Sequence, residues 1–574
     1  MTNRPSSFLA VVRRLPTWWR LVAIRVVLLL ASCTDATAPQ TNPDECANDR
    51  GHQLGIGQVV AGSGDPRSLC IEVRQKGEYV LIPFVASPRD TLLQADIVLS
   101  GSGLGPVVPS SSRVASRADV QAGASDGLAT EEDRAAFDAG LRDVEAELFR
   151  RLGGPGPHLR SQLAPASVTI PAEGSTVEIN VASRCDATNI RHGRVAAVSQ
   201  RAIVLADTGN PTVGFSELDY DGFARDFDDF VFPTLSEAFG SPTDIDENGR
   251  VILFFTRAVN ELTPPGGTGV IAGYFWGGDV FPRHSDGGLG GCAASNEGEI
   301  LYLAIPDPGE EIGSTPISAE TLRRVALSTI GHELQHLINT GRRLHVNGAS
   351  TVEEKWLNEG LSFMAEELLF YAASGLSAGQ NLGVEEIRST PQVQDAFVRF
   401  AESNLGRLNL YLQGTHFSSP MGSDLLPTRG AAWSFLRYVA DRDGSPDENL
   451  LRALANSTDV GLANLQQVIG SDPLEWMRDW SIAIYTDDLV PPSDPRFDQP
   501  SWNHRQLIAS LRVDGLYPLR TVALGDGEST LTLPAGGSVY AYFGAEAGSR
   551  IRVRAILVEP SADVDVWLSL VRIR

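Results

Sequence analysis

The sequence has no long hydrophobic run and no excess of basic residues, and each absence disfavours a class of protein. A helix that crosses a bilayer needs about 20 apolar residues, and no stretch of that kind is present. The 574 residues include 47 basic and 71 acidic ones, which gives a formal net charge of −24. So much negative charge repels phosphate backbones, so we expect no nucleic-acid partner. With 42% hydrophobic and 21% charged residues, the composition is that of a globular protein.

Cysteine is also scarce, with five residues in the chain and no C-x-x-C pair, which argues against a cysteine metal site. The first of them, Cys33, follows an arginine-rich segment and a short apolar run. Residues 1–33 therefore have the pattern of an export signal, and Leu30-Ala31-Ser32-Cys33 resembles the lipobox of bacterial lipoproteins. We expect an exported bacterial protein that meets the membrane only through a lipid on Cys33. An ordinary secretory signal and a secreted protein are the alternative.

The four other cysteines suggest disulfide bonds. Cys46, Cys70, Cys185 and Cys292 form an even set, and an exported protein meets an oxidising compartment, so two disulfides are expected. Three connectivities are open. We favour Cys46–Cys70, which would lie within one small module, and therefore Cys185–Cys292.

Alternating apolar residues predict β structure near both ends of the chain. Residues 34–45 are a polar tether, residues 46–104 a small β module, and residues 501–574 a β-sandwich-like module. Residues 105–157 contain a linker and an amphipathic helix over Glu131–Leu152. Residues 158–500 form the central region. The expected fold class is α+β, with this region flanked by two β modules.

Within the central region, predicted strands and helices alternate with glycine-rich segments. Gly266–Gly291 is predicted to be a long loop, and its aromatic cluster Tyr274-Phe275-Trp276 is predicted to be core. Ile300–Ile305 is predicted to be a strand. Three helical patterns follow, over Ala319–Asn339, Val352–Ala372 and Arg429–Asp441.

The first of these three helices contains the motif His332-Glu333-Leu334-Gln335-His336, an H-E-x-x-H. Histidines at i and i+4 of a helix point the same way, so both imidazoles can bind one ion, and imidazole suits Zn²⁺. Glu333 projects beside the pair, where it could accept a proton from water at the metal. The motif predicts a zinc site with His332 and His336 as ligands and Glu333 as the catalytic base.

A catalytic zinc ion needs a third protein ligand. Asn339 and Arg342 stand where the metzincin pattern requires glycine and histidine, so that class is excluded. Glu359, on the next predicted helix, is well placed to be the third ligand. Glu366, Glu367 and His345 are its rivals.

These motifs together resemble a family. Two histidines and a glutamate from a following helix are the gluzincin arrangement, and Asn358-Glu359-Gly360 resembles the sequence around the ligand glutamate of those enzymes. His332–Ile338, Glu354–Ser362 and the upstream stretch Ser295–Tyr302 resemble the hyicolysin-type family of bacterial secreted metallopeptidases. The resemblance implies a zincin-like metallopeptidase domain with His332, His336 and Glu359 as zinc ligands and Glu333 as general base.

Two departures from related enzymes concern the groups around the zinc site. Phe363 stands where thermolysin-like enzymes keep an aspartate that orients a ligand histidine, so the sequence does not identify that partner. Peptide hydrolysis also needs a donor for the developing oxyanion. The candidate donors are Tyr371, Tyr411, His416, Tyr438 and Arg429.

A second metal site is a candidate upstream of the motif. Asp244, Asp246 and Asn248 place oxygen donors at alternating positions before a glycine turn, like the first half of a Ca²⁺ loop. The twelfth position of an EF-hand would be Phe255, which excludes that motif. A simpler calcium loop and a capped turn both remain open.

The sequence thus predicts an exported zinc-dependent metalloendopeptidase that acts on protein or peptide substrates. Ile300–Ile305 is expected at the cleft edge, where it would pair with an extended substrate. Two other functions remain open: a cell-surface binding or adhesion protein with a zincin-like fold, and a metallohydrolase of a non-peptide bond.

Overall fold

The computed structural model describes most of the chain beyond residue 50. The described residues are 51–62, 67–88, 92–105, 128–151, 170–263, 271–284, 291–312, 316–491, 494–525 and 527–574. The predicted export signal with Cys33, the tether and Cys46 lie outside them, so their roles stay predictions. No helix in the described part of the chain is both long and apolar enough to cross a membrane.

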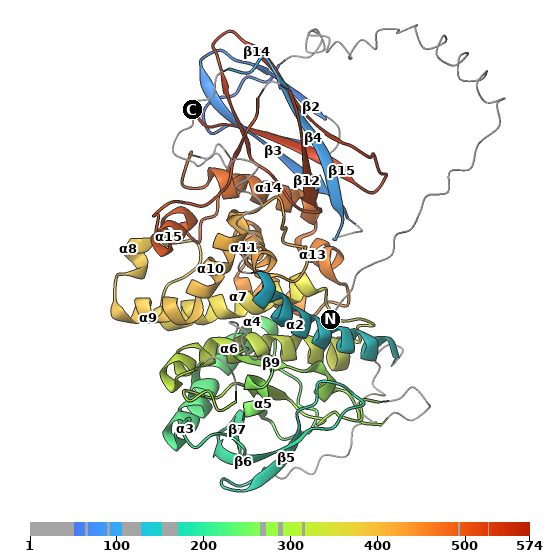
Figure 1. The fold of residues 1–574 in the computed structure, drawn as a ribbon, viewed down its shortest axis with the longest axis vertical. Helices are drawn as coiled ribbons and strands as arrows, with labels where there is room; N and C mark the ends of the chain where they lie inside the picture. The colour runs from blue at the N-terminus through green and yellow to red at the C-terminus, as the bar shows by residue number, and fades with distance from the viewer. Residues whose placement is uncertain are drawn as a thin grey trace, which may run out of the picture. The chain divides into compact units, whose positions relative to one another are not determined.

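Strands from the N-terminal and C-terminal segments form a β-sandwich (Figure 1). One sheet has the order β1-β15-β3-β13-β11 and the other the order β12-β4-β14-β2. The strands are β1 (Val59–Ala61), β2 (Ser68–Glu72), β3 (Gly77–Ala86), β4 (Gln94–Ser102), β11 (Val522–Ala523), β12 (Gly527–Pro534), β13 (Ala541–Ala545), β14 (Arg550–Leu557) and β15 (Asp565–Arg572). Apolar side chains such as Leu81, Ile551 and Leu568 form its core.

This sandwich corrects the prediction of two separate β modules. β3 lies between β15 and β13, and β4 lies between β12 and β14, so both strands have C-terminal strands on each side. Leu81, for example, is opposite both Ala541 and Leu570. Alternation identifies a strand and its inner face, but it does not identify the partner strand, so the sequence pattern could not reveal this pairing.

A six-stranded mixed sheet lies in the central region, with the order β5-β6-β7-β8-β10-β9. Its strands are β5 (Thr176–Asn180), β6 (Ile190–Val198), β7 (Ala202–Asp207), β8 (Val251–Phe255), β9 (Gly273–Phe275) and β10 (Ile300–Leu303). β7, β8 and β10 are parallel and nearly all apolar, as expected for strands buried on both faces. β9 runs antiparallel to β10.

The edge of this sheet corrects two expectations. β9 lies inside Gly266–Gly291, which we expected to be a loop throughout, because three residues are too few to show alternation. β10 lies between β8 and β9, so the predicted strand Ile300–Ile305 is not free to pair with a substrate. The free edge on this side of the sheet belongs to β9.

One predicted disulfide is present in the central region. Cys185, in the connection from β5 to β6, is bonded to Cys292, which precedes β10. Cys70 is also disulfide-bonded, and its predicted partner Cys46 lies outside the described residues.

Two helices carry the candidate site, close to where the sequence predicts them. Helix α6 (Ala319–Gly341) packs against β9 and β10, and helix α7 (Lys355–Ser374) packs against α6. The Ser318 side chain caps α6 by accepting a hydrogen bond from the backbone N–H of Thr321. Helix α11 (Leu426–Asp443) packs against the other side of α7.

The described residues also form further helical segments. They are α3 (Glu217–Asp226), η3 (Phe227–Val231), α4 (Phe232–Phe239), α5 (Arg257–Asn260), η4 (Gly277–Val280), η5 (Arg342–Asn347), α8 (Val384–Ile387), α9 (Pro391–Phe400), α10 (Glu402–Leu412), α12 (Asp447–Ala455), α13 (Gly461–Ile469), α14 (Pro473–Thr486), η6 (Pro495–Phe497) and α15 (His504–Leu511).

Helix α2 (Leu128–Arg151) forms where the amphipathic pattern predicts a helix. Its side chains Leu141, Leu148 and Phe149 are buried in the same apolar core as the six-stranded sheet. The helix packs against η4, the turn that follows β9. α2 is therefore part of the central region, although its sequence lies between a predicted linker and that region.

Candidate metal centre

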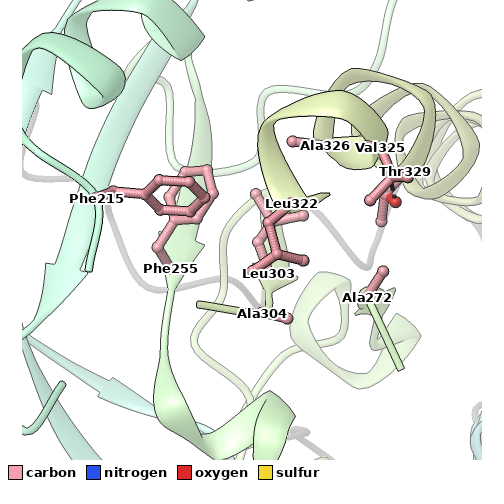
Figure 2. A pocket seen from close by; sticks show the side chains of 9 residues that line it. All are labelled: Phe215, Phe255, Ala272, Leu303, Ala304, Leu322, Val325, Ala326 and Thr329. Carbon is pink, nitrogen blue, oxygen red and sulfur yellow. Dashed lines mark hydrogen bonds between the residues drawn. The ribbon is translucent and has the colours of Figure 1, made fainter. Parts of the chain in front are cut away.

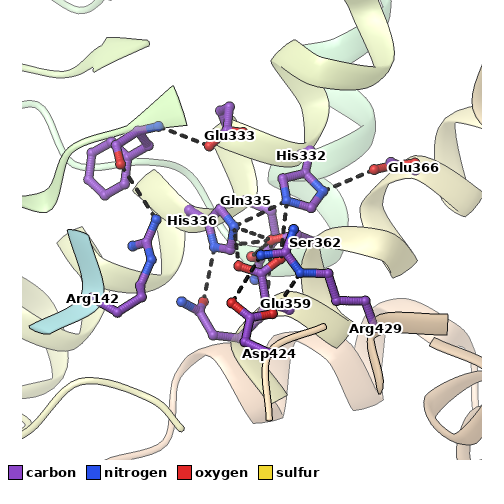
Figure 3. Close-up of polar contacts among 12 residues, drawn as sticks. Arg142, His332, Glu333, Gln335, His336, Glu359, Ser362, Glu366, Asp424 and Arg429 are labelled. Carbon is purple, nitrogen blue, oxygen red and sulfur yellow. Dashed lines mark hydrogen bonds and ion pairs between the residues drawn. The ribbon is translucent and has the colours of Figure 1, made fainter. Parts of the chain in front are cut away.

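Helices α6 and α7 bring three ligand-type side chains to one point. His332 and His336 lie one turn apart on α6, and their Nε2 atoms are 3.2 Å from each other. Glu359 faces them from α7, with one carboxylate oxygen 3.4 Å from His336 Nε2 and the other 3.6 Å from His332 Nε2. Figure 3 shows the three side chains converging. Glu333, the acidic residue of the H-E-x-x-H motif, lies beside them on α6.

The spacing of these atoms fits a zinc ion. Two nitrogens at about 2.1 Å from one tetrahedral zinc ion lie roughly 3.4 Å apart, close to the distances observed here. The carboxylate of Glu359 is 4% exposed, and its Oε2 atom accepts no hydrogen bond from the described part of the chain. A buried carboxylate oxygen without a donor is costly, and a cation would satisfy it. The donor set of two imidazoles and one carboxylate is that of a catalytic zinc site.

Both histidines are oriented through their second ring nitrogen. His332 Nδ1 lies 2.9 Å from a carboxylate oxygen of Glu366, and His336 Nδ1 lies 3.2 Å from the side-chain oxygen of Asn358. Asn339 donates a further hydrogen bond to the same Asn358 oxygen. These contacts leave Nε2 of each ring directed at the other ligands, as metal-binding histidines require.

Glu366 was a rival of Glu359 as third ligand, and its place shows another role. It lies on the Nδ1 side of His332, and Arg407 approaches its other oxygen at 3.8 Å. Phe363, at the position where the expected aspartate is missing, packs against the His332 ring. A carboxylate from the following turn of α7 thus occupies the position that the sequence left without a residue. The contact between Glu366 and His332 depends on how α7 is rotated against α6, and spacing in the sequence does not define that rotation.

The other two rivals lie elsewhere. Glu367 accepts hydrogen bonds from the indole nitrogens of Trp433 and Trp502. His345 contacts the backbone oxygen of Val280 through Nε2. The structure therefore brings Glu359, and neither of these side chains, to the histidine pair.

Glu333 occupies the space between α6 and the edge strand β9. Its side chain is nearly buried, and one carboxylate oxygen accepts a hydrogen bond from the backbone N–H of Phe275 at 2.9 Å. This bond holds the carboxylate at the free edge of the sheet, beside the metal centre.

The charges around the site keep Glu359 ionised. Burial raises the pKa of Glu359, but the charges of Arg429 and His336 outweigh burial and hold this pKa well below its ordinary value. For His332, burial lowers the pKa, whereas the carboxylates of Glu359 and Glu366 raise it, to about 9. A metal ion must therefore displace a proton from His332 in order to bind.

Arg429 is the oxyanion candidate that lies at the site. Its Nη1 atom is 3.6 Å from Glu359 Oε2, and Asp424 holds the guanidinium through bonds of 2.6 and 3.0 Å. The hydroxyls of Tyr371 and Tyr438 bond elsewhere, to Glu367 and to the backbone oxygen of Arg496. The ring of Tyr411 stacks on Trp480, and His416 lies against Phe417.

At the candidate calcium loop, the structure adds a third carboxylate to the two predicted aspartates. Carboxylate oxygens of Asp244 and Asp246 lie within 4.8 Å of each other and of Glu299, so these three residues could hold a metal ion. The side chain of Asn248, the third residue of the predicted loop, donates to Asp246 and accepts from the backbone N–H of Arg250. Burial raises the pKa of Asp246 to about 6 and that of Glu299 to about 7. Calcium binding at this loop stays a prediction.

A small pocket lies on the Glu333 face of α6, starting one turn before Glu333. Figure 2 shows its lining. Apart from Thr329 all the lining side chains are apolar: Phe215, Phe255, Ala272, Leu303, Ala304, Leu322, Val325 and Ala326. With no charged group, this pocket is suited to neither metal binding nor proton transfer.

Comparison with known proteins gives a distant relation to a metalloprotease. No protein-family model matches the chain. Over 144 residues the chain is 25% identical to the neutral metalloprotease ShpI of Staphylococcus hyicus, a match that covers 25% of this chain and 29% of the relative. The chain thus matches less than a third of the relative's length. The match indicates a relation to a metalloprotease.

Proposed function

We propose that the chain is a zinc-dependent endopeptidase. The convergence of His332, His336 and Glu359, with Glu333 beside them, carries this proposal because it supplies the ligands and the base of a hydrolytic zinc site. The relation to a neutral metalloprotease supports a peptide or protein substrate. The alternatives of an adhesion protein and of a hydrolase for non-peptide bonds gain no specific support.

In the mechanism that we propose, the chain's residues hold the ion and move one proton. His332, His336 and Glu359 would bind the zinc ion, which when bound acidifies water and polarises a carbonyl group. Glu333 takes a proton from the attacking water, whose oxygen bonds to the scissile carbonyl carbon. As the C–N bond breaks, Glu333 passes this proton to the leaving nitrogen.

Arg429 would stabilise the negative charge that develops on the substrate carbonyl oxygen. Its guanidinium is buried beside Glu359 and fixed by Asp424, so it is already oriented before the reaction. Fixed donors at the place where charge develops contribute more than donors that must first reorient. The arginine at the start of α11 is thus the oxyanion donor in this proposal.

The substrate backbone would pair with β9. This strand is the sheet edge nearest Glu333, and an extended peptide commonly binds a protein by adding a strand to a free edge. Such pairing engages backbone groups and needs no particular side chain. It therefore suits an enzyme that cleaves unstructured protein segments.

Export and attachment to the cell envelope through Cys33 belong to the same proposal. They depend on residues 1–33, which lie outside the described residues. Growth of cells with radiolabelled palmitate, for the natural chain and for Cys33→Ala, tests the attachment directly. Label that appears on the natural chain and not on Cys33→Ala supports lipid attachment.

The proposed activity is tested on an unstructured protein such as casein. The full chain is compared with Glu333→Gln and with Glu320→Gln, a matched change of a carboxylate in the first turn of the same helix. We expect about one zinc ion in all three proteins and a loss of hydrolysis of about 10² to 10⁴-fold in Glu333→Gln alone. Equal hydrolysis by the natural chain and Glu333→Gln would contradict the assignment of the base. Absence of bound zinc from all three proteins would contradict the assignment of His332, His336 and Glu359 as ligands.

A further inference from the structure

β9 is the last strand of its sheet, and no strand of the described residues pairs with its outer edge. Tyr274 is opposite Tyr302 of β10, whereas the N–H and C=O of Phe275 bond to groups outside the sheet. Trp276, which follows β9, is still extended, so the next outward-facing group is the N–H of Gly277 at the start of η4. A peptide added to this edge would bond to the C=O of Phe275 and the N–H of Gly277.

Helix α2 already occupies both of these groups. A guanidinium nitrogen of Arg142 donates to the backbone oxygen of Phe275 at 3.5 Å, and a carboxylate oxygen of Glu145 accepts from the N–H of Gly277 at 3.0 Å. Arg142 and Glu145 also form an ion pair with each other. This side-chain pair gives the strand one donor and one acceptor, as a residue of a bound peptide would.

Apolar contacts hold α2 along the whole segment after β9. Phe137 meets Tyr274 edge to face at 5.4 Å, and about three turns further on Phe149 meets Phe281 in the same way at 5.5 Å. Leu141 and Leu148, on the same face of α2, are buried. The helix is therefore packed into the edge of the sheet.

The same helix reaches the metal centre. Figure 3 shows Arg142 of α2 at the metal centre, where the charges of Glu359 and Glu333 act on it. Burial lowers the pKa of Arg142, but the carboxylates of Glu145, Glu359 and Glu333 outweigh burial and raise it. On the side of α7, Asp143 lies 3.5 Å from Lys355 at the start of that helix. α2 thus bridges the edge strand and the helix that carries Glu359.

The hydrogen bonds between α2 and the edge of β9 leave some buried polar atoms of α2 unsatisfied, which makes displacement of the helix feasible. Arg142 Nε and one oxygen of Glu145 are buried without a hydrogen-bond partner in the described part of the chain. A buried ion pair whose polar atoms are not all satisfied adds little stability, since its desolvation offsets the attraction between the charges. An extended peptide that satisfies Phe275 and Gly277 could therefore compete with α2 for the edge.

We propose that α2 is an autoinhibitory helix that covers the substrate-binding edge of β9, and that a peptide substrate binds only when this helix is displaced. The proposal rests on the proposed endopeptidase function and adds the regulation of that site. Displacement follows from release of α2 in the intact chain or from cleavage of the chain on either side of it.

The test removes the two side chains that occupy the edge. Arg142→Ala/Glu145→Ala is made in the full chain beside Glu147→Ala/Arg150→Ala, a matched control because that pair has the same i, i+3 spacing on α2 but is exposed. Binding of a fluorescently labelled unstructured peptide is measured by anisotropy in a Glu333→Gln background, where the peptide is not consumed. The hydrolysis rate of the same peptide is measured with Glu333 intact.

We expect peptide binding and hydrolysis to rise about tenfold or more in Arg142→Ala/Glu145→Ala, since a hydrogen bond to a charged group corresponds to roughly that factor. The control pair should match the natural chain in both measurements. A folded Arg142→Ala/Glu145→Ala variant whose binding and hydrolysis equal those of the control would overturn the autoinhibitory role.

A second version of the test guards against loss of folding. Recognition sites for a sequence-specific protease are placed in residues 106–127 and 152–169, and the chain is cut after it has folded. Peptide binding should rise on cutting, and unchanged binding after complete cutting contradicts the proposal. Hydrolysis that is absent from every form, while peptide binding still rises, would refute the endopeptidase function and leave the role of α2 standing.

Discussion

The β-sandwich and the metal centre bury opposite kinds of side chain, although the same chain builds both. The sandwich core consists of apolar residues, and the buried polar groups in its sheets are few, such as Ser569 and Arg572. Around α6 and α7, by contrast, carboxylates, amides and imidazoles are buried close together, among them Glu333, His336 and Glu359. Burial of apolar groups stabilises a fold, whereas burial of charged groups costs stability unless they are paired. The contrast agrees with the proposal that the region around α6 and α7 carries out hydrolysis, whereas the sandwich core stabilises the fold.

The strongest test of this comparison is removal of a ligand. His336→Ala deletes one of the three converging side chains, and we expect zinc affinity to fall by more than about a thousandfold and hydrolysis to become undetectable. Dialysis against a chelator series followed by metal analysis measures the affinity. The apolar core of the sandwich should be unaffected. A variant that retains stoichiometric zinc at nanomolar concentration would show that His336 is not a ligand.

The matching change in the sandwich should act on stability alone. Ile551→Ala removes a fully buried side chain from β14, which costs about 2–5 kcal/mol of unfolding free energy. Urea unfolding followed by circular dichroism measures the loss. Zinc content and kcat of the folded fraction should equal those of the natural chain. A change in kcat at temperatures where the variant is folded would mean that the two regions are coupled.

A smaller effect is expected from the group that orients a ligand. Glu366→Gln keeps the size of the side chain but removes the charge beside His332 Nδ1, and such a change costs about 10 to 100-fold in metal affinity. Glu385→Gln, in the first turn of α8, is a control at a distance from the ligands. Competition with a chromogenic chelator gives both affinities. Equal values would show that Glu366 does not support the ligand.

The smallest effect on stability is expected for an exposed ion pair of α6, the helix that carries the two histidines. Arg323 of α6 pairs with Asp219 of α3, and its guanidinium bonds hold the pKa of Asp219 at about 2. This carboxylate is ionised above its unfolded-state pKa of about 4, so its contribution to stability is complete there and disappears as the pH falls through 2. Because Arg323 is half exposed, solvent screens the pair, and Asp219→Asn should cost less than about 1 kcal/mol at pH 7. Thermal unfolding at pH 7 and at pH 2 measures the difference, which should be much smaller at the lower pH.

Local features of the sequence were sufficient for part of the site. The H-E-x-x-H motif fixes its own geometry because a helix places residues i and i+4 on one face, and the helix over Ala319–Asn339 was visible from its apolar spacing. Glu359 could be singled out as a candidate because the gluzincin arrangement requires an acid on a following helix. Its convergence with the histidines needed the packing of α7 on α6.

Features that depend on contacts between distant segments were beyond the sequence. Glu366 orients His332 because of the rotation between two helices, and Arg142 reaches the site because α2 packs on η4. The edge strand β9 is defined by its pairing with β10 and has no pattern of its own. The single sandwich could not be predicted for the same reason, because the alternation within a strand does not indicate which strand pairs with it.

The pairing of β3 with β13 and β15 also sets an order of events during synthesis. β3 ends at Ala86, and the strands that cover its two sides begin at Ala541 and Asp565. At roughly 5 to 20 residues per second, a ribosome needs about 20 to 90 s to reach β13 after it completes β3. During that interval neither hydrogen-bonding side of β3 has its final partner, and unpaired strand edges invite association with other chains. The nascent protein must therefore keep this strand shielded until the last residues of the chain are made.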